Sequence, residues 1–177
     1  MIRKATRNDA QAILDTRVAA IRAQCREFYS AEILDIWTSG DLTEQFILWV
    51  ESSFHVTVEG DRVLGSGAID LHSGQIDGIF VLPDFMSKGI GRQLLAYLEN
   101  MAVAAGLDQL VLNSTLNAAP FYRKCGYEGN AVAVYSSPRG FSLDCVPMSK
   151  VLRRSAVDAQ PCGQAGLAHK VAQGRLL

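Results

Sequence analysis

The sequence lacks the features that mark nucleic-acid-binding and zinc-binding proteins. Its 17 basic and 18 acidic side chains leave a net charge of −1, whereas a protein whose main task is to hold nucleic acid usually carries a basic surplus. We therefore expect no nucleic-acid partner. The four cysteines, Cys25, Cys125, Cys145 and Cys162, show no CxxC spacing and no neighbouring histidine cluster. This pattern predicts reduced thiols and no metal site.

Long apolar runs are also missing. No stretch approaches the roughly 18–20 apolar residues of a membrane span, and the first residues contain no apolar signal-peptide core. We therefore expect a cytoplasmic protein with no membrane partner. The 177 residues, of which 49% are apolar, are compatible with one domain that buries a substantial core.

The periodicity of apolar residues predicts one α/β domain in residues 1–150. Helical spacing dominates the first third of the chain, and strict alternation begins at Phe54. The predicted elements are, in chain order, a strand at 1–6, helices over about 8–28, 31–37 and 43–52, strands at 54–59, 63–72 and 75–81, a helix at 89–105, a strand at 107–113, a helix at 117–125, and strands at 127–136 and 141–149. This order predicts a single mixed, mostly antiparallel sheet flanked by helices. Residues 151–177 lose the periodicity, and we predict that they form a loosely ordered tail.

One segment joins a strand to a helix through a turn that is rich in small residues. The turn, Ser87–Arg92, carries glycines at positions 89 and 91. Backbone N–H groups at a helix N-terminus lack intrahelical partners, and the helix dipole is positive there. Glycines without Cβ atoms let a pyrophosphate approach these N–H groups closely. The turn is no P-loop, because Lys88 precedes the glycine, and no dinucleotide fingerprint, because Leu94 stands where a third glycine is needed.

The turn resembles the coenzyme A turn, [QR]xxGx[GA], of the GNAT superfamily of acetyl-CoA-dependent N-acetyltransferases. The segment Asn117–Tyr127 is similar to the second block of that family, in which an Asn opens a helix and a Tyr lies five residues on. The resemblance covers residues 2–150, and it implies a GNAT-like acyl-CoA N-acyltransferase fold with acetyl-CoA as co-substrate. The chain departs from the family at Met86, where Gln or Arg is common. A thioether cannot donate a hydrogen bond to a phosphate, so we expect backbone donors to hold the coenzyme.

The resemblance also implies a set of coenzyme-binding residues and a proton donor. Tyr122 stands where the family places the donor to the departing thiolate, although a packing aromatic is the alternative. Asn117 bonds the pantetheine arm, caps its helix, or does both. The residues implied to bind the coenzyme are Ile79, Phe80, Val81, Ser87, Lys88, Gly89, Ile90, Gly91, Arg92, Asn117 and Tyr122.

The reaction needs a base as well, because an alkyl ammonium group has a pKa near 10 and must lose a proton before it attacks. Alternation along the strand at 75–81 places Gln75, Asp77, Ile79 and Val81 on one face. Asp77 is the only carboxylate among them and is the candidate base, acting directly or through water. A solvated aspartate at a strand end is the alternative, since several family members use ordered water instead of a fixed carboxylate.

The acceptor pocket of such enzymes is usually built from the first helices and the late strand loops. Tyr29, Trp37 and Arg139 are the candidates to bind the acceptor, together with Glu32 and Asp35. Ordinary packing or surface solvation is the alternative for each of them.

The sequence thus predicts an N-acetyltransferase that moves an acetyl group from acetyl-CoA to a primary amine of a small molecule, by direct attack in a ternary complex. A protein or peptide N-acetyltransferase and a non-catalytic acyl-CoA-binding module are the alternatives. The sequence identifies neither the amine nor the oligomeric state, although a homodimer is compatible with the resemblance.

Overall fold

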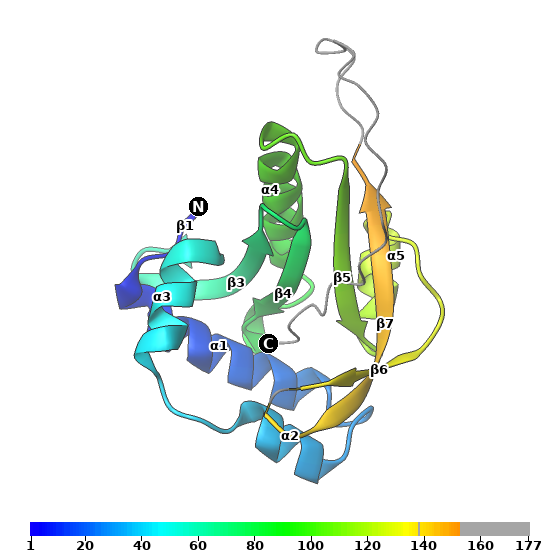
Figure 1. The fold of residues 1–177 in the computed structure, drawn as a ribbon. Coiled ribbons are helices and arrows are strands. Elements are labelled where there is room, and N and C mark those ends of the chain that lie inside the picture. Colours follow the sequence, from blue (N-terminus) through cyan, green and yellow to red (C-terminus); the bar gives the residue numbers. More distant parts are fainter. Residues whose placement is uncertain (138, 153–177) are drawn as a thin grey trace.

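One mixed sheet organises the protein in a computed structural model that describes residues 1–137 and 139–152 (Figure 1). Its strands are β1 (Ile2–Lys4), β2 (Phe54–Glu59), β3 (Arg62–Asp70), β4 (Gln75–Val81), β5 (Gln109–Thr115), β6 (Ala133–Ser136) and β7 (Ser142–Val151). They lie in the order β1-β2-β3-β4-β5-β7-β6. Only the pairing of β4 with β5 is parallel among the described strands. The predicted fold class is therefore confirmed.

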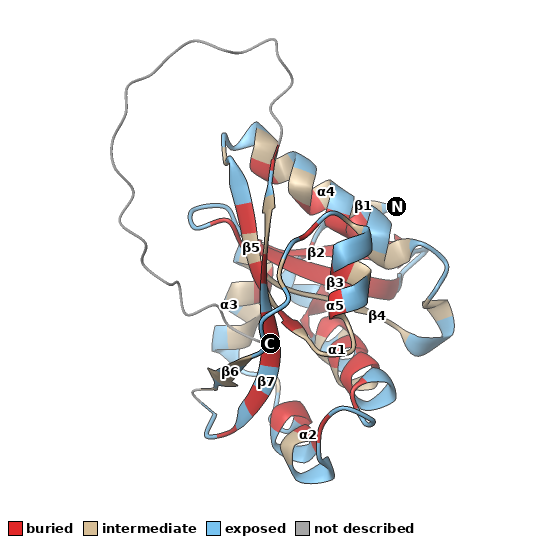
Figure 2. Ribbon diagram, turned by 90° about the vertical axis from the view of Figure 1, so that its right-hand side faces the viewer, coloured by how far each residue is buried: buried red, intermediate tan, exposed pale blue. Residues whose placement is uncertain are grey.

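Helices cover both faces of this sheet. The helices are α1 (Ala10–Gln24), α2 (Ala31–Thr38), α3 (Glu44–Ser53), α4 (Ile90–Ala104) and α5 (Ala119–Lys124), with short 3-10 turns at η1 (Arg7–Asp9) and η2 (Pro83–Phe85). On one face, α4 lies so close to β3 that a Cβ atom on Gly67 would stand 3.2 Å from the side chains of Leu94 and Leu98. On the other face, α1 and α3 pack on Val56 and Ala68. The strands between the two layers carry nearly half of the buried residues (Figure 2).

The parallel pair β4–β5 is joined at only one point. Gln75 pairs with Val111, and the Val111 N–H donates to the carbonyl oxygen of Gly74 (3.0 Å). Beyond this point the ladder ends, although β4 continues to Val81 and β5 to Thr115. The C-terminal halves of the two strands separate in Figure 1. A sheet that opens at the carboxyl ends of parallel strands leaves room for a ligand there.

A β-bulge changes the predicted alternation along β4. Ala68 pairs with Gly78 and the next residue, Ile69, pairs with Ile76, so Asp77 is an extra residue in the ladder. Paired residues of antiparallel strands share a face, and an extra residue shifts the alternation. Gln75 therefore lies on the face opposite to Ile79 and Val81. The prediction that these three share one face is wrong.

Several element boundaries also differ from the sequence prediction. The first helix ends at Gln24 instead of near residue 28, because residues 26–28 form a turn. Residues 44–53 are helical throughout, with the Thr43 hydroxyl accepting from the Phe46 N–H (3.2 Å). The last strand reaches Val151, two residues beyond its predicted end at 149, and the side chain of Leu152 is buried. The predicted tail otherwise lies outside the described residues.

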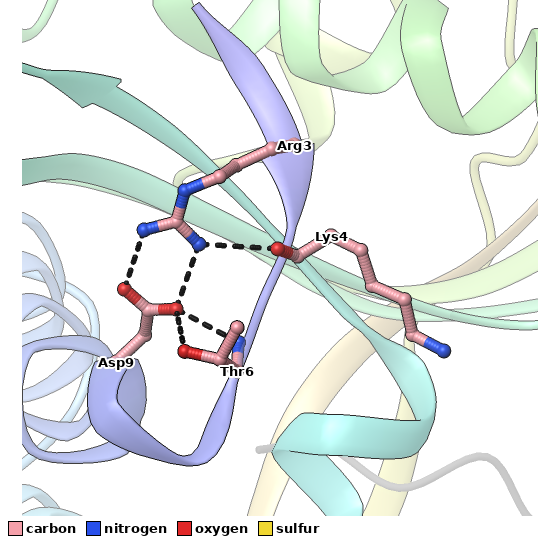
Figure 3. Close-up of polar contacts among 4 residues, drawn as sticks. All are labelled: Arg3, Lys4, Thr6 and Asp9. Atoms are coloured by element: carbon pink, nitrogen blue, oxygen red, sulfur yellow. Dashed lines mark hydrogen bonds and ion pairs between the residues drawn. The ribbon is translucent and has the colours of Figure 1, made fainter.

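A buried carboxylate fastens the first strand to the first helix. Asp9 accepts two hydrogen bonds from the Arg3 guanidinium and two from Thr6, one from its N–H and one from its hydroxyl, all at 2.8 Å (Figure 3). A carboxylate with several charge-assisted donors strongly favours its ionised form. The Arg3 side chain, with the Thr6 donors, lowers the pKa of Asp9 to about 2 against the opposing effect of burial.

We predict that Asp9→Asn destabilises the protein at neutral pH by about 1–2 kcal/mol. The pKa of Asp9 is lower in the folded than in the unfolded protein. Its contribution is therefore complete above pH about 4 and disappears as the pH falls toward 2. Urea unfolding of parent and variant between pH 2 and 7 should show the two stability curves converging at low pH. Asp15→Asn, which changes an exposed carboxylate on α1, serves as the control, and a gap that stays constant down to pH 2 would contradict the prediction.

Candidate active site

The turn before α4 presents unshielded backbone donors. Ser87 has φ 61° and Gly89 has φ 84°, so both residues adopt the left-handed conformation that turns the chain into the helix. No side chain of the described residues caps the N-terminus of α4. The first N–H groups of this helix are therefore available to an external acceptor, and the helix dipole favours an anion beside them.

This helix end opens into a cavity of about 600 Å³ between the separated halves of β4 and β5. Its walls come from β4, from the turn, from the start of α5 and from α1 and α2. Most of the predicted coenzyme-binding residues line it: Ile79, Phe80, Val81, Ser87, Gly89, Gly91, Arg92, Asn117 and Tyr122. The structure thus brings together two sequence blocks that lie far apart in the chain.

Lys88 and Ile90 are predicted coenzyme-binding residues that do not line this cavity. The Lys88 ammonium lies 4.7 Å from the ring centroid of Phe85, which also has the Arg62 guanidinium at 4.9 Å. Ile90 packs toward β3, where a Cβ atom on Gly65 would stand 3.2 Å from its Cγ2 atom. Ile90 therefore anchors the start of α4 to the sheet, and its backbone is the part that faces the turn.

Tyr122 lies in the core at the floor of the cavity. It is buried against Tyr127, with the two ring centroids 5.7 Å apart. Burial raises the pKa of its phenol well above the usual range, and a backbone hydrogen bond with Ile79 opposes this only in part. A phenol in this state is protonated at neutral pH and can donate a proton.

The Asn117 side chain faces α1 instead of capping its helix. Its Oδ1 atom accepts a hydrogen bond from the Cys25 thiol (3.4 Å), and α5 begins after Ala118 without a side-chain cap from the described residues. The predicted capping role of Asn117 is therefore wrong. Burial raises the pKa of Cys25 to about 11, so this cavity-lining thiol is neutral at physiological pH. A neutral thiol is a poor nucleophile.

Asp77, the predicted base, is half-buried at the bulge of β4 and does not line the cavity. The prediction of Asp77 as the base assumed that side chains alternate regularly between the two faces along β4. The bulge removes this regular alternation.

The residues predicted to bind the acceptor separate into different places. Trp37 is 1% exposed yet contributes to the cavity wall. Tyr29 is buried beside Trp37, and its hydroxyl donates to the Asp144 carbonyl oxygen (2.8 Å) and accepts from the Leu116 N–H (2.9 Å). Arg139 lies in the loop before β7 and lines a second cavity. Glu32 and Asp35 are exposed on α2, and Asp35 pairs with Arg22 of α1 (3.0 Å).

Sequence reasoning missed the contribution of α1 to the cavity. Ala20, Ile21, Gln24 and Cys25 line it together with Met86. The Gln24 amide nitrogen contacts the Met86 sulfur. An amide donor therefore lies next to the position where the family usually supplies one. The helical spacing of Ile21 and Gln24 gave no signal, because it does not show which face of α1 meets the turn.

Comparison with known proteins places this fold and cavity in one enzyme family. The acetyltransferase (GNAT) domain family matches residues 22–152, which is more than half of the chain. The chain belongs to this family of acyltransferases, as the two sequence blocks predicted.

Similar proteins agree with this assignment. The chain is 33% identical over 79 residues to the uncharacterized N-acetyltransferase YjcF of Bacillus subtilis, covering 44% of this chain and 56% of that protein. It thus spans little more than half the length of that relative. A GCN5-related N-acetyltransferase from Rhodopseudomonas palustris superposes with a TM-score of 0.79 at 25% identity, covering 86% of this chain and 95% of that one. A PaiA N-acetyltransferase from Thermoplasma acidophilum, solved in complex with coenzyme A, superposes with a TM-score of 0.66 at 17% identity, covering 85% and 98%.

The described residues contain neither a metal-binding cluster nor a membrane-spanning helix. No group of three or more histidine, cysteine or acidic side chains is arranged to hold a metal ion within 1–137 and 139–152. Within the same ranges, no helix combines the length and the apolar character that crossing a membrane requires.

We predict that Gly91→Val abolishes coenzyme A binding without unfolding the protein. A Cβ atom on Gly91 would meet its neighbours, Phe121, Val81 and Ile79, at 3.6 to 3.8 Å, which is ordinary contact. The branched side chain would occupy space beside the N–H groups of α4, and the affinity should fall at least about tenfold.

Calorimetric titration with coenzyme A measures this loss, and thermal unfolding checks the fold. Ala96→Val adds a branched side chain at an exposed position of the same helix and should bind normally. Undiminished affinity in a folded Gly91→Val protein would exclude this turn as the phosphate site.

Proposed function

We propose that this protein transfers an acetyl group from acetyl-CoA to a primary amine of a small molecule by direct attack in a ternary complex. One observation carries the proposal: the uncapped N-terminus of α4 and the buried phenol of Tyr122 face the same cavity between β4 and β5. Such a helix end suits the pyrophosphate of a coenzyme. A protonated phenol further along the cavity suits the departing thiolate.

Each part of acetyl-CoA can be assigned to a group of the residues implied to bind it. The N–H groups of Gly91 and Arg92 are positioned to donate to the pyrophosphate oxygens, and the Arg92 side chain adds positive charge beside them. The edge of β4 that faces away from β3 at Ile79 and Val81 offers backbone groups to the amide-containing pantetheine arm. A fold relative was solved in complex with coenzyme A, which supports coenzyme A as the kind of ligand bound.

Direct attack is favoured over an acyl-enzyme intermediate. Cys25 is the thiol that lines the cavity, and its pKa of about 11 keeps it protonated. A covalent route would need a thiolate or an adjacent base to activate it. Histidine does not occur among the described residues that line this cavity.

Proton transfer is then divided between two groups. Tyr122 supplies the proton that the coenzyme thiolate requires, since a thiol pKa lies near 8.5. We retain Asp77 as the proposed acceptor of the amine proton. Because Asp77 does not line the cavity, this proton must travel through water.

A panel of amines tests the function. Free thiol release from acetyl-CoA is measured with amino acids, polyamines and aminoglycosides, and with peptides that carry a free terminus or a lysine. We expect at least one small amine to be acetylated faster than any peptide at equal concentration. Transfer to peptides alone would replace the small-molecule acceptor, and coenzyme binding without thiol release from any amine would favour a binding module.

We predict that Tyr122→Phe lowers turnover at saturating acetyl-CoA by about 10²–10⁴-fold, the usual contribution of general acid catalysis. The change removes one oxygen atom and keeps the ring in the core, so coenzyme affinity should change little. Tyr127→Phe is the matched control, because Tyr127 is buried beside Tyr122 but does not line the cavity. If Tyr122→Phe retains turnover close to that of the parent, the proton-donor role is excluded.

A further inference from the structure

A second cavity, of about 460 Å³, lies beside the first and holds two arginine side chains. Arg17 comes from α1 and Arg139 from the loop before β7. Both donate to the same atom, the carbonyl oxygen of Trp37, at 2.9 and 3.1 Å respectively. Two positive charges therefore converge on one neutral oxygen atom.

Arg17 is unusual because it is only 6% exposed. A guanidinium carries five N–H donors, and within residues 1–137 and 139–152 Arg17 makes just its one hydrogen bond to Trp37. No carboxylate of the described residues forms an ion pair with Arg17 or Arg139. Burial, and then the charge of Arg139, lower the pKa of Arg17 to about 10. Buried charges are normally paired, so this pair of cations lacks an anion among the residues that the structure describes.

A structural role explains only part of this arrangement. The Trp37 carbonyl belongs to the last turn of α2, and cations stabilise the C-terminal ends of helices. Arg139 alone would satisfy this role, because it also donates to the carbonyl oxygen and hydroxyl of Ser39. The remaining donors of Arg17 have no acceptor in the described part of the chain. Asp41 also lines the cavity but is exposed and forms no ion pair with either arginine.

Four aromatic residues form a large part of the cavity wall, which also includes Leu14 and several small polar residues. Phe46, Trp49 and Tyr135 line it together with Trp37. Trp37 lines the first cavity as well, so the two cavities adjoin at this residue. A ligand can therefore place an anionic group near the arginines while its other end lies close to the thioester region.

We propose that this cavity binds the carboxylate of the acceptor, so that the substrate is an amine that also carries a carboxylate group. The proposal rests on the function proposed above and narrows its substrate class. A planar carboxylate matches the fork of a guanidinium and accepts two parallel hydrogen bonds from it. The aromatic walls accommodate the apolar part of such a molecule.

Binding can be measured without turnover, because the two tryptophans of the chain, Trp37 and Trp49, both line this cavity. Intrinsic fluorescence is titrated with phenylacetate and with phenylacetamide, which has nearly the same shape but no charge. We expect phenylacetate to bind about 10- to 100-fold more tightly than the amide, as hydrogen bonds to a charged group predict. Arg139→Gln should remove this difference while leaving the affinity for phenylacetamide unchanged.

Control variants distinguish a carboxylate site from a general effect of losing one positive charge. Arg22→Gln removes an exposed arginine of α1 that pairs with Asp35, and it should keep the preference for phenylacetate. Arg17→Gln is measured in parallel if it folds, and Arg139→Gln decides the result if it does not. Equal affinity for the two probes, a preference that survives in Arg139→Gln, or quenching by inorganic phosphate but not by phenylacetate would each overturn the proposal.

A kinetic experiment tests the same site during turnover. It compares KM for an amino acid that the amine panel shows to be acetylated with KM for the uncharged amide of that amino acid. Arg139→Gln should raise KM for the acid about 10- to 100-fold and leave the amide unaffected. An equal loss for both substrates would overturn the carboxylate site but leave the acetyltransferase function standing. Absence of turnover with every amine would contradict the proposed function, while the fluorescence titration would still report on the cavity.

Discussion

The single ladder contact between β4 and β5 is the constraint on which the site depends. Two parallel strands that stayed paired would satisfy each other's backbone groups and close the sheet. Here the pairing ends after Gln75 and Val111. The later residues of β4 consequently turn an open edge toward β5, and the loop after β4 leads directly into the uncapped end of α4. The cavity and its access to the core follow from this early separation, and the uncapped turn supplies its backbone donors.

Buried tyrosine side chains fasten the elements around this opening. The hydroxyl of Tyr29 connects the end of β5, through the Leu116 N–H, with β7, through the Asp144 carbonyl oxygen. The residue itself lies between α1 and α2, so it ties the first helices to the far half of the sheet. Tyr122 fills the floor of the opening from α5. Two buried tyrosines thus connect the helical layers to the strands around the opening.

The sequence predicted the parts of this design that depend on local chemistry. The turn with its two glycines and the helix of Tyr122 could be found because glycine spacing and apolar periodicity are local signals. The prediction failed where distant segments decide the result. The bulge at Asp77 depends on how β3 and β4 pair across Ala68 and Ile69, and regular alternation was the wrong assumption.

Contacts between side chains that lie far apart in the chain could not be predicted from the sequence either. The helical position of Asn117 suggested a cap for its own helix, but its side chain meets Cys25 of α1. Tyr29 and Arg139 share a predicted role in acceptor binding, whereas the structure places Tyr29 in a hydrogen-bonded link between strands and Arg139 in a second cavity. Nothing in the sequence indicated that Arg17 is buried, since an arginine on an amphipathic helix is ordinarily solvated.

Trp37 contributes to the walls of both cavities. Its ring packs between Tyr29 and Phe141, with ring centroids at 6.0 and 6.2 Å, so this aromatic cluster sets its position. If a ligand in one cavity shifts Trp37 and thereby changes the affinity of the other cavity, thermodynamic linkage requires that the second ligand changes the affinity for the first by the same factor. One aromatic residue could in this way couple two ligands energetically, with no hinge or domain movement.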